Sequence, residues 1–202
     1  MSDANSIIRL MNSILRSDAI NHVQFRIASV SVMPYGYGYI ADMLQSGTIT
    51  VVFNDLGNLV TAAYNKCVIT INSNGAVDLS GPGGRGTLVH ESTHAVMDAI
   101  GVGKMIDYGD CEVAAYVAQY VYSMASGDVV NVDGPWGAPS ARIANSVLNS
   151  QGLYDLPPAE YQDLKSTLLS GYGDVAQSQG QLVPGFNLMH GIPARVYEPM
   201  QP

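Results

Sequence analysis

Apolar residues recur along the chain with helical spacing in some segments and as short β-branched runs in others. Apolar positions between Ile7 and Leu15, spaced three and four residues apart, predict an amphipathic helix over about residues 3–16, capped by Ser2 or Asp3. Runs rich in Val, Ile and Thr at Thr48–Phe53 and Cys67–Asn72 predict two strands, and each run is followed by Asn- and Gly-rich turn residues. The first part of the chain therefore predicts one helix and a small sheet.

Helical patterns dominate the second half of the chain. We expect one helix at about Thr87–Ile100 and another at about Asp110–Ala125, with glycines near their ends. Proline and glycine positions favour two further helices, over Pro139–Asn149 and Pro158–Leu169. From Gly173 onward the chain has little periodicity, so we expect it to cross the surface without regular structure.

Two further segments bear on the layout. Tyr35–Tyr39 alternates tyrosine with glycine after Pro34 and predicts a loop, packed against the core or lining a cleft. No internal repeat or clear linker divides the chain. We therefore expect residues 1–202 to form a single domain, with a helix and sheet in 1–80 and helical and irregular structure in 81–202.

Composition narrows the class of protein. Of the 202 residues, 47% are apolar and 13% are charged, which favours a folded core over disorder. The net charge of −8 and the lack of a Lys/Arg cluster argue against nucleic-acid binding. No apolar stretch approaches the roughly 18 residues that a membrane span needs. Cys67 and Cys111 are too few for a disulfide framework, so two buried free thiols are expected, with a pair as the alternative.

The segment His90-Glu91-Ser92-Thr93-His94 is the strongest motif. Residues four apart on a helix share a face, so His90 and His94 can reach one metal ion. Glu91 is then placed to take a proton from water and return it to a leaving amine. A catalytic zinc site uses three protein ligands and an open position, so a third ligand must come from elsewhere in the chain.

The motif and its surroundings resemble a known family. Leu88–Asp98 is similar to the active-site helix of thermolysin-like metallopeptidases, in which HE, any residue and THAV are followed by another residue and Asp. In that group, the gluzincins, the third ligand is a glutamate on the next helix. The resemblance implies that Glu112, which lies 18 positions after His94 in an alanine-containing stretch, is that ligand.

The resemblance covers about 30 residues and departs from the family at one defined position. Where these enzymes have an aspartate four positions after the ligand glutamate, this chain has Tyr116. Asp98 or Asp110 is the candidate for orienting a metal-bound histidine instead. His190, the one histidine after the motif, is the candidate for polarising the substrate carbonyl, with an ordinary loop histidine as the alternative.

Other zinc peptidase classes and one unrelated site can be compared with the same sequence. Metzincins need Gly and His where this chain has Met97 and Ile100, which excludes that class. Aspzincins use an aspartate as third ligand, which leaves Asp107 or Asp110 open. Gly81–Gly86 matches GxGxxG, the pattern of a dinucleotide-binding loop. Such a loop needs a strand directly before it and a second parallel strand after the next helix. Here no strand leads directly into the loop and the next helix is followed by another helix, so we do not expect a dinucleotide site.

These features together predict an α+β, zincin-like fold, with a small antiparallel or mixed sheet packed on the HExxH helix and a mostly helical C-terminal half. We expect a Zn²⁺-dependent metallopeptidase, more an endopeptidase than an exopeptidase, acting on a peptide or protein substrate. The alternative is a catalytically inactive zincin-fold binding module or a structural-zinc protein. Lys66–Asn72 is the candidate edge strand for an extended substrate, with an interior strand as the alternative.

The N-terminus and the composition bear on localisation. The N-terminus lacks a conventional secretory signal, so we expect a cytoplasmic protein or one secreted by a specialised route. The low lysine count and many Ser, Gly, Asn and Tyr residues favour an exported effector or toxin, with a housekeeping intracellular peptidase as the competing interpretation.

Overall fold

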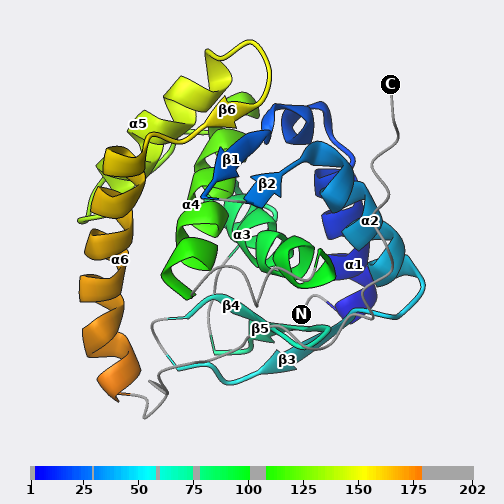
Figure 1. The fold of residues 1–202 in the computed structure, drawn as a ribbon. Coiled ribbons are helices and arrows are strands. Elements are labelled where there is room, and N and C mark those ends of the chain that lie inside the picture. Colours follow the sequence, from blue (N-terminus) through cyan, green and yellow to red (C-terminus); the bar gives the residue numbers. More distant parts are fainter. Residues whose placement is uncertain (1–2, 29, 58–59, 75–77, 101–107, 179–202) are drawn as a thin grey trace.

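The computed structural model describes residues 3–28, 30–57, 60–74, 78–100 and 108–178, which form an α+β arrangement (Figure 1). The six α-helices in this part of the chain are α1 (Ala4–Leu15), α2 (Pro34–Gln45), α3 (Pro82–Ala99), α4 (Tyr108–Ala125), α5 (Gly137–Leu148) and α6 (Pro158–Ser178). A 3₁₀ helix, η1 (Asp18–His22), follows α1. The strands are β1 (Phe25–Ile27), β2 (Val30–Val32), β3 (Thr50–Asn54), β4 (Ala62–Asn65), β5 (Val68–Asn72) and β6 (Tyr154–Asp155).

The strands form two small mixed sheets. One has the order β2-β1-β6, with β1 antiparallel to β2 and parallel to β6. The other has the order β3-β5-β4, with β5 parallel to β3 and antiparallel to β4. The candidate edge strand Lys66–Asn72 corresponds to β5, which is the central strand of its sheet. The alternative prediction, an interior strand, is therefore confirmed. The edge strand that packs against α3 is β4.

Helix α3 lies at the centre of the molecule, and α1, α2, α4 and β4 pack around it (Figure 1). Every residue from Leu88 to Ala99 is buried. Apolar and small side chains lie on all sides of this helix, as is typical of a helix without a solvent face. Its polar side chains are therefore inside the protein, where each needs a partner.

The prediction of a loop at Tyr35–Tyr39 is wrong, because these residues belong to α2. Pro34 is the first residue of α2, a position where the fixed φ of proline favours a helix. A Cβ added to Gly36 would lie 2.9 Å from Val96 Cγ1, so glycine permits close approach of α2 to α3. The Tyr37 hydroxyl lies 2.8 Å from the Thr93 hydroxyl across the same contact. Gly36 and Tyr37 of this segment thus contribute to the contact between α2 and α3.

The Gly81–Gly86 segment also differs from expectation. Helix α3 begins at Pro82, five residues before the predicted start at Thr87. A Cβ on Gly84 would lie 2.3 Å from both the Asp78 carbonyl oxygen and Leu79 Cα, and one on Gly86 would lie 2.9 Å from Ser123 Oγ. These glycines let the start of α3 pack closely on its surroundings. They lie in a helix rather than in a phosphate-binding loop.

The remaining elements follow the sequence more closely. Asp3 caps α1 by accepting a hydrogen bond from the Ser6 backbone N–H, as predicted. Helices α4 and α5 begin within about two residues of their predicted starts, whereas α6 continues to Ser178, beyond both its predicted end and Gly173. Strands β1, β2, β4 and β6 were not predicted. Cys67 and Cys111 are free thiols; Cys111 is buried and Cys67 is half-buried.

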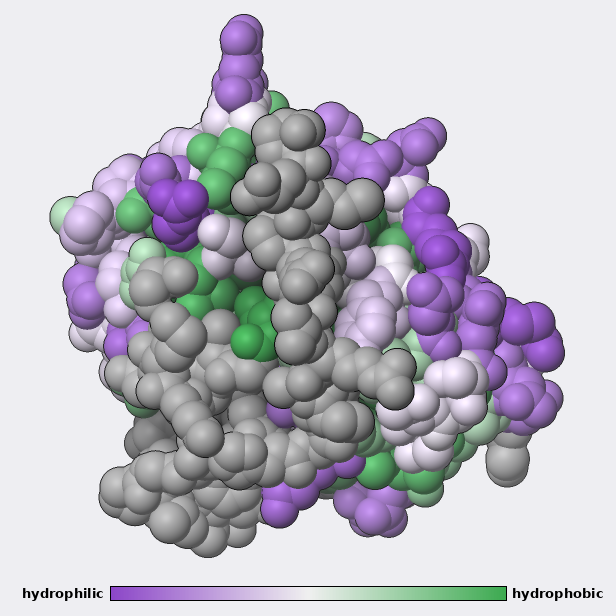
Figure 2. Space-filling model, turned by 45° about the vertical axis from the view of Figure 1, so that its right-hand side comes forward, coloured by the Kyte–Doolittle hydropathy of each residue, from purple (hydrophilic) through white to green (hydrophobic). Residues whose placement is uncertain are grey.

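The surface of the described residues mixes polar and apolar side chains. On the face shown in Figure 2, hydrophilic residues surround smaller groups of hydrophobic ones. Within the described residues, no helix has the length and hydropathy to cross a lipid bilayer.

Candidate metal centre

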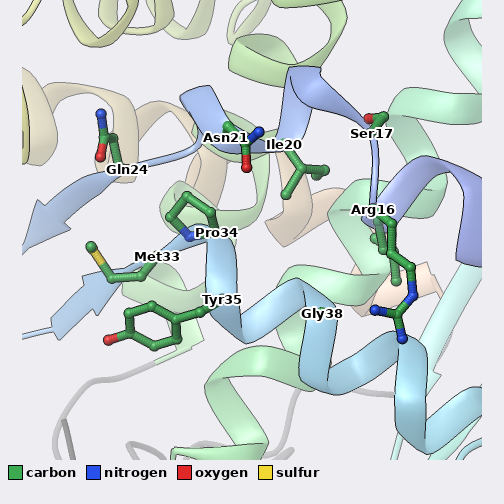
Figure 3. A pocket seen from close by; sticks show the side chains of 10 residues that line it. Arg16, Ser17, Ile20, Asn21, Gln24, Met33, Pro34, Tyr35 and Gly38 are labelled. Atoms are coloured by element: carbon green, nitrogen blue, oxygen red, sulfur yellow. The ribbon is translucent and has the colours of Figure 1, made fainter. Parts of the chain in front are cut away.

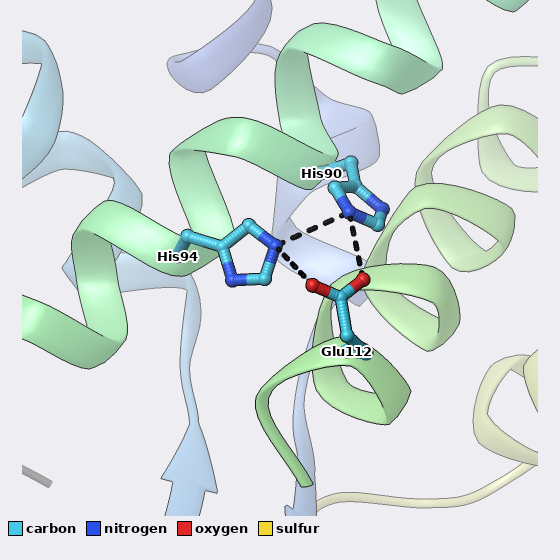
Figure 4. Close-up of side chains that lie close together, drawn as sticks. All are labelled: His90, His94 and Glu112. Atoms are coloured by element: carbon cyan, nitrogen blue, oxygen red, sulfur yellow. Dashed lines mark hydrogen bonds and ion pairs between the residues drawn. The ribbon is translucent and has the colours of Figure 1, made fainter. Parts of the chain in front are cut away.

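Helices α3 and α4 bring His90, His94 and Glu112 together (Figure 4). The Nε2 atoms of His90 and His94 lie 3.2 Å apart. Glu112 Oε2 is 3.5 Å from Nε2 of His90, and Oε1 is 3.4 Å from Nε2 of His94. The two histidines are one helical turn apart on α3, and the glutamate extends from the second turn of α4, so the close packing of these helices forms the cluster.

The separations within the cluster fit a single small divalent ion. Zinc binds imidazole nitrogen and carboxylate oxygen at about 2.0–2.2 Å in tetrahedral geometry, which places two ligand atoms about 3.4 Å apart. The two Nε2 atoms, 3.2 Å apart, are close to that spacing, and each lies 3.4–3.5 Å from a different oxygen of Glu112, so both carboxylate oxygens face the space between the histidines. Two imidazole Nε2 atoms that face each other can share at most one proton. A cation between them would satisfy both lone pairs, so the donor set suits a metal ion.

Burial and charge shape the protonation of the cluster. Burial lowers the pKa of His94 to about 4, although the charge of Glu112 opposes this shift. Burial also acts to lower the pKa of His90, but its contact with Glu112 and the charge of Glu91 outweigh that effect and raise the pKa. His94 is therefore neutral near pH 7, which is the form of histidine that binds metals.

Glu91 lies beside the cluster and is held by the backbone of strand β4. Its side chain is buried, and burial raises its pKa to about 7. Glu91 Oε2 accepts a hydrogen bond of 2.7 Å from the Tyr64 backbone N–H. A carboxyl with a pKa near neutrality can both take and give a proton, as a general base that becomes a general acid must do.

Tyr116 occupies the position where thermolysin-like enzymes have an aspartate, and it contacts His90 with its ring. The two rings meet edge to face, with centroids 4.7 Å apart and planes at 82°. The Trp136 ring lies behind Tyr116 at 6.1 Å. In the described part of the chain, Nδ1 of His90 and Nδ1 of His94 have no hydrogen-bond partner. His90 therefore packs against the Tyr116 ring, and the Gln119 side chain is a further polar neighbour of His90.

The two aspartates considered as histidine partners bind other groups. Asp98 Oδ2 accepts a hydrogen bond of 2.6 Å from the Tyr64 hydroxyl. Asp110 Oδ1 accepts hydrogen bonds from Tyr161 and Lys165 of α6, so it ties α6 to the first turn of α4. Glu112, and not Asp110, shares the cluster with the two histidines.

Two predicted candidates cannot be placed. His190, the candidate for carbonyl polarisation, and Asp107, an alternative third ligand, lie outside the described residues.

An open pocket of about 560 Å³ lies elsewhere, between η1 and the start of α2 (Figure 3). Its lining includes Arg16, Asn21, Gln24 and Tyr35. None of the lining residues is His, Cys, Asp or Glu, so the pocket offers neither the metal-ligand set of the cluster nor a carboxylate like that of Glu91. It is not a second candidate for the chemistry described above.

Sequence reasoning missed Tyr64 as a residue of this site. The backbone N–H of Tyr64 contacts Glu91, and a main-chain donor has no signature in the residue types. The only sequence signal near it is the aromatic residue in Ala62–Asn65, a run too short to predict a strand.

No protein-family model, curated protein or solved structure matches this chain.

Proposed function

We propose that this protein is a zincin-like, gluzincin-type metallopeptidase in which His90, His94 and Glu112 hold Zn²⁺. The observation that supports this most is the spacing of the three ligand groups, 3.2–3.5 Å between their nearest atoms, beside a buried glutamate. A bound zinc ion supplies Lewis-acid chemistry, which activates water and polarises a peptide carbonyl.

The chain's own residues supply the proton transfers. Glu91 Oε2 is held by the Tyr64 amide, which leaves Oε1 free to take a proton from the attacking water. The same carboxyl then donates that proton to the leaving amine. In the metal-free protein burial raises the pKa of this carboxyl to about 7, and the charge of a bound cation would lower it, so that Glu91 is the base at neutral pH.

The proposed binding site for an extended peptide is the outer edge of β4, with which no other strand pairs within the described residues. Tyr64 is opposite Ile69 in the antiparallel pair, and its N–H points away from β5 toward Glu91. Alternation along the strand then places the backbone groups of Ala62 on the same outer edge. An added strand would pass the Glu91 carboxylate, and an internal segment of a peptide can bind in this way, which favours endopeptidase activity.

The test is to compare wild-type protein with Glu91→Gln. We expect wild-type protein purified with zinc to contain about one zinc per chain and to cleave a mixed library of unstructured peptides. Glu91→Gln should keep the zinc and lose at least about 100-fold in kcat, the lower end of the range for losing a general base. Wild-type protein that binds zinc but cleaves no peptide in the library would contradict the proposal.

The burial of the cluster favours one competing function, a structural zinc site, because its three ligand residues are only 4–8% exposed. Structural zinc sites are normally closed by four protein ligands, whereas His90, His94 and Glu112 make three within the described residues. A structural site would also have no use for Glu91. Zinc that resists removal by chelators, together with identical behaviour of wild-type and Glu91→Gln protein, would favour this alternative.

A further inference from the structure

Tyr64 is joined to helix α3 at two points. Its backbone N–H donates to Glu91, and its side-chain hydroxyl donates to Asp98. Glu91 and Asp98 are seven residues apart, so they lie on one face of α3, two turns from each other. Tyr64 of strand β4 thus contacts α3 at two points on the face that carries Glu91, the proposed general base.

The hydrogen bond between the Tyr64 hydroxyl and Asp98 is short and buried. Both side chains are buried, with Tyr64 5% and Asp98 4% exposed, and their oxygens are 2.6 Å apart. A charge-assisted hydrogen bond of this length, screened from water, is among the stronger polar contacts in a protein core. Burial and the neighbouring Asp98 raise the pKa of Tyr64 far above its ordinary value, so the hydroxyl remains a donor.

The turn after β4 is hydrogen-bonded to the same hydroxyl. The Cys67 backbone N–H donates to the Tyr64 hydroxyl oxygen at 3.2 Å. Lys66 and Cys67 both have positive φ, 45° and 67°, which is costly for residues other than glycine. Two consecutive residues with positive φ are typical of the tight turn that joins two antiparallel strands. The Tyr64 side chain therefore helps to fix the end of β4 as well as its contact with α3.

We propose that Tyr64 is a positioning residue: the bond between its hydroxyl and Asp98 fixes its backbone N–H against Glu91 and so orients the general base. The inference rests on the proposed function, because it assigns a role in the proton transfers of that site. The Tyr64 side chain acts through its own main chain and need not touch the substrate.

The first test follows amide hydrogen exchange in metal-free protein, which needs no activity. In Tyr64→Phe, we expect the amide of residue 64 to exchange at least about ten-fold faster relative to the amide of Thr70, which lies opposite Ala63 in the same strand pair. Tyr120→Phe is the matched control, because it removes a 2.6 Å phenol bond to the Asn131 carbonyl, on a different element. The control should leave the ratio of the two exchange rates unchanged.

Asp98 provides a second route to the same test. Asp98→Asn keeps an oxygen that can accept from the Tyr64 hydroxyl, so it should retain most of the protection, whereas Asp98→Ala should lose it as Tyr64→Phe does. Unchanged protection of the residue 64 amide in both Tyr64→Phe and Asp98→Ala would overturn the inference.

The second test measures kcat and KM on any peptide that wild-type protein cleaves. Tyr64→Phe should lower kcat by about ten-fold with unchanged zinc content and KM, and Tyr120→Phe should not. A loss of activity that only parallels loss of zinc would overturn the inference. If wild-type protein cleaves nothing, the proposed peptidase function fails, while the exchange experiment still shows whether Asp98 fixes the amide against Glu91.

Discussion

At the scale of single residues, the metal cluster places ionisable groups where the surrounding core is apolar. His90, His94 and Glu112 are almost fully buried, in helices α3 and α4 whose apolar residues, such as Val89 and Val113, are buried as well. Burying such groups is costly unless each has a partner. A shared cation would supply that partner for all three residues at once, so each should contribute strongly to metal affinity.

Glu112→Gln tests the contribution of the third ligand. The amide keeps the size of the side chain but removes the negative charge, so we expect zinc affinity to fall by more than about 100-fold. Removing a residue that only hydrogen-bonds to a metal ligand already lowers metal affinity by about 10–100-fold. Competition with a zinc-binding dye measures the affinity, and Asp163→Asn, which neutralises an exposed carboxylate, is the control. Wild-type affinity in Glu112→Gln would rule out Glu112 as a ligand.

At the scale of elements, glycines set how closely α3 approaches its neighbours. Gly83 and Gly84 are adjacent in the first turn of α3, yet a Cβ would meet nothing within 4 Å at Gly83 and would overlap backbone atoms at Gly84. The backbone of Asp78 and Leu79 cannot move aside as a flexible side chain could. The two positions therefore form a matched pair for testing the packing.

Gly84→Ala should destabilise the fold by about 3 kcal/mol, since the new methyl group must displace backbone. Gly83→Ala should leave stability unchanged or raise it by up to about 1 kcal/mol, because alanine is the better helix former. Urea denaturation followed by circular dichroism measures both free energies of unfolding. Equal stabilities for the two variants would show that the start of α3 does not pack as described.

Lys66→Gly tests strain in the turn between β4 and β5. Lys66 is exposed and has a φ of 45°, so its side chain adds the cost of a left-handed conformation, about 1–2 kcal/mol, without compensating burial. Glycine removes that cost but loses more backbone entropy on folding. We therefore expect the free energy of unfolding to rise by about 0.5–1 kcal/mol. Lys66→Ala keeps a Cβ and should give no gain. Thermal denaturation of both variants measures the difference, and a gain from alanine equal to that from glycine would argue against backbone strain.

The elements also show what the sequence can and cannot predict. Long periodic segments with caps or prolines, such as α1 and α4, were found within two or three residues of their ends. The strands β1, β2 and β6, with two or three residues each, are too short for any periodicity to appear. Helix α2 was missed because it contains glycines, which usually disfavour helices, and one of them, Gly36, is needed for contact with Val96. That requirement comes from tertiary packing, which local sequence does not record.

The same limit applies to the site. His90 and His94 were grouped because helix geometry places residues four apart on one face, and Glu112 was added only by the family resemblance; the structure brings all three together. The contact from Tyr64 to Glu91 joins residues 27 positions apart through a backbone N–H. Any residue type except proline supplies that donor, so only the three-dimensional arrangement of β4 and α3 shows it.

At the scale of the whole molecule, a bound metal would join α3 to α4, the two helices that form the centre of the core. Sheet strand β4 and helix α2 pack on α3, while α5 and α6 pack on α4. An ion held by His90 and His94 from one helix and by Glu112 from the other would therefore stabilise the contact on which both groups of elements depend. Because the unfolded chain lacks the assembled site, the binding free energy would add to the stability of the fold.

Adding zinc to metal-free protein should accordingly raise Tm with zinc concentration. Free zinc at 100 times Kd contributes about 2.7 kcal/mol, and each further ten-fold adds about 1.4 kcal/mol. For a chain of 202 residues, 1 kcal/mol shifts Tm by roughly 2–4 °C, so the first increment corresponds to a rise of about 5–10 °C. A chelator should reverse the rise, and Glu112→Gln should abolish most of it. Mg²⁺ should have little effect, because two imidazole ligands suit zinc and not a cation that prefers oxygen. An equal rise with Mg²⁺, or a full rise with Glu112→Gln, would place the bound ion somewhere other than this cluster.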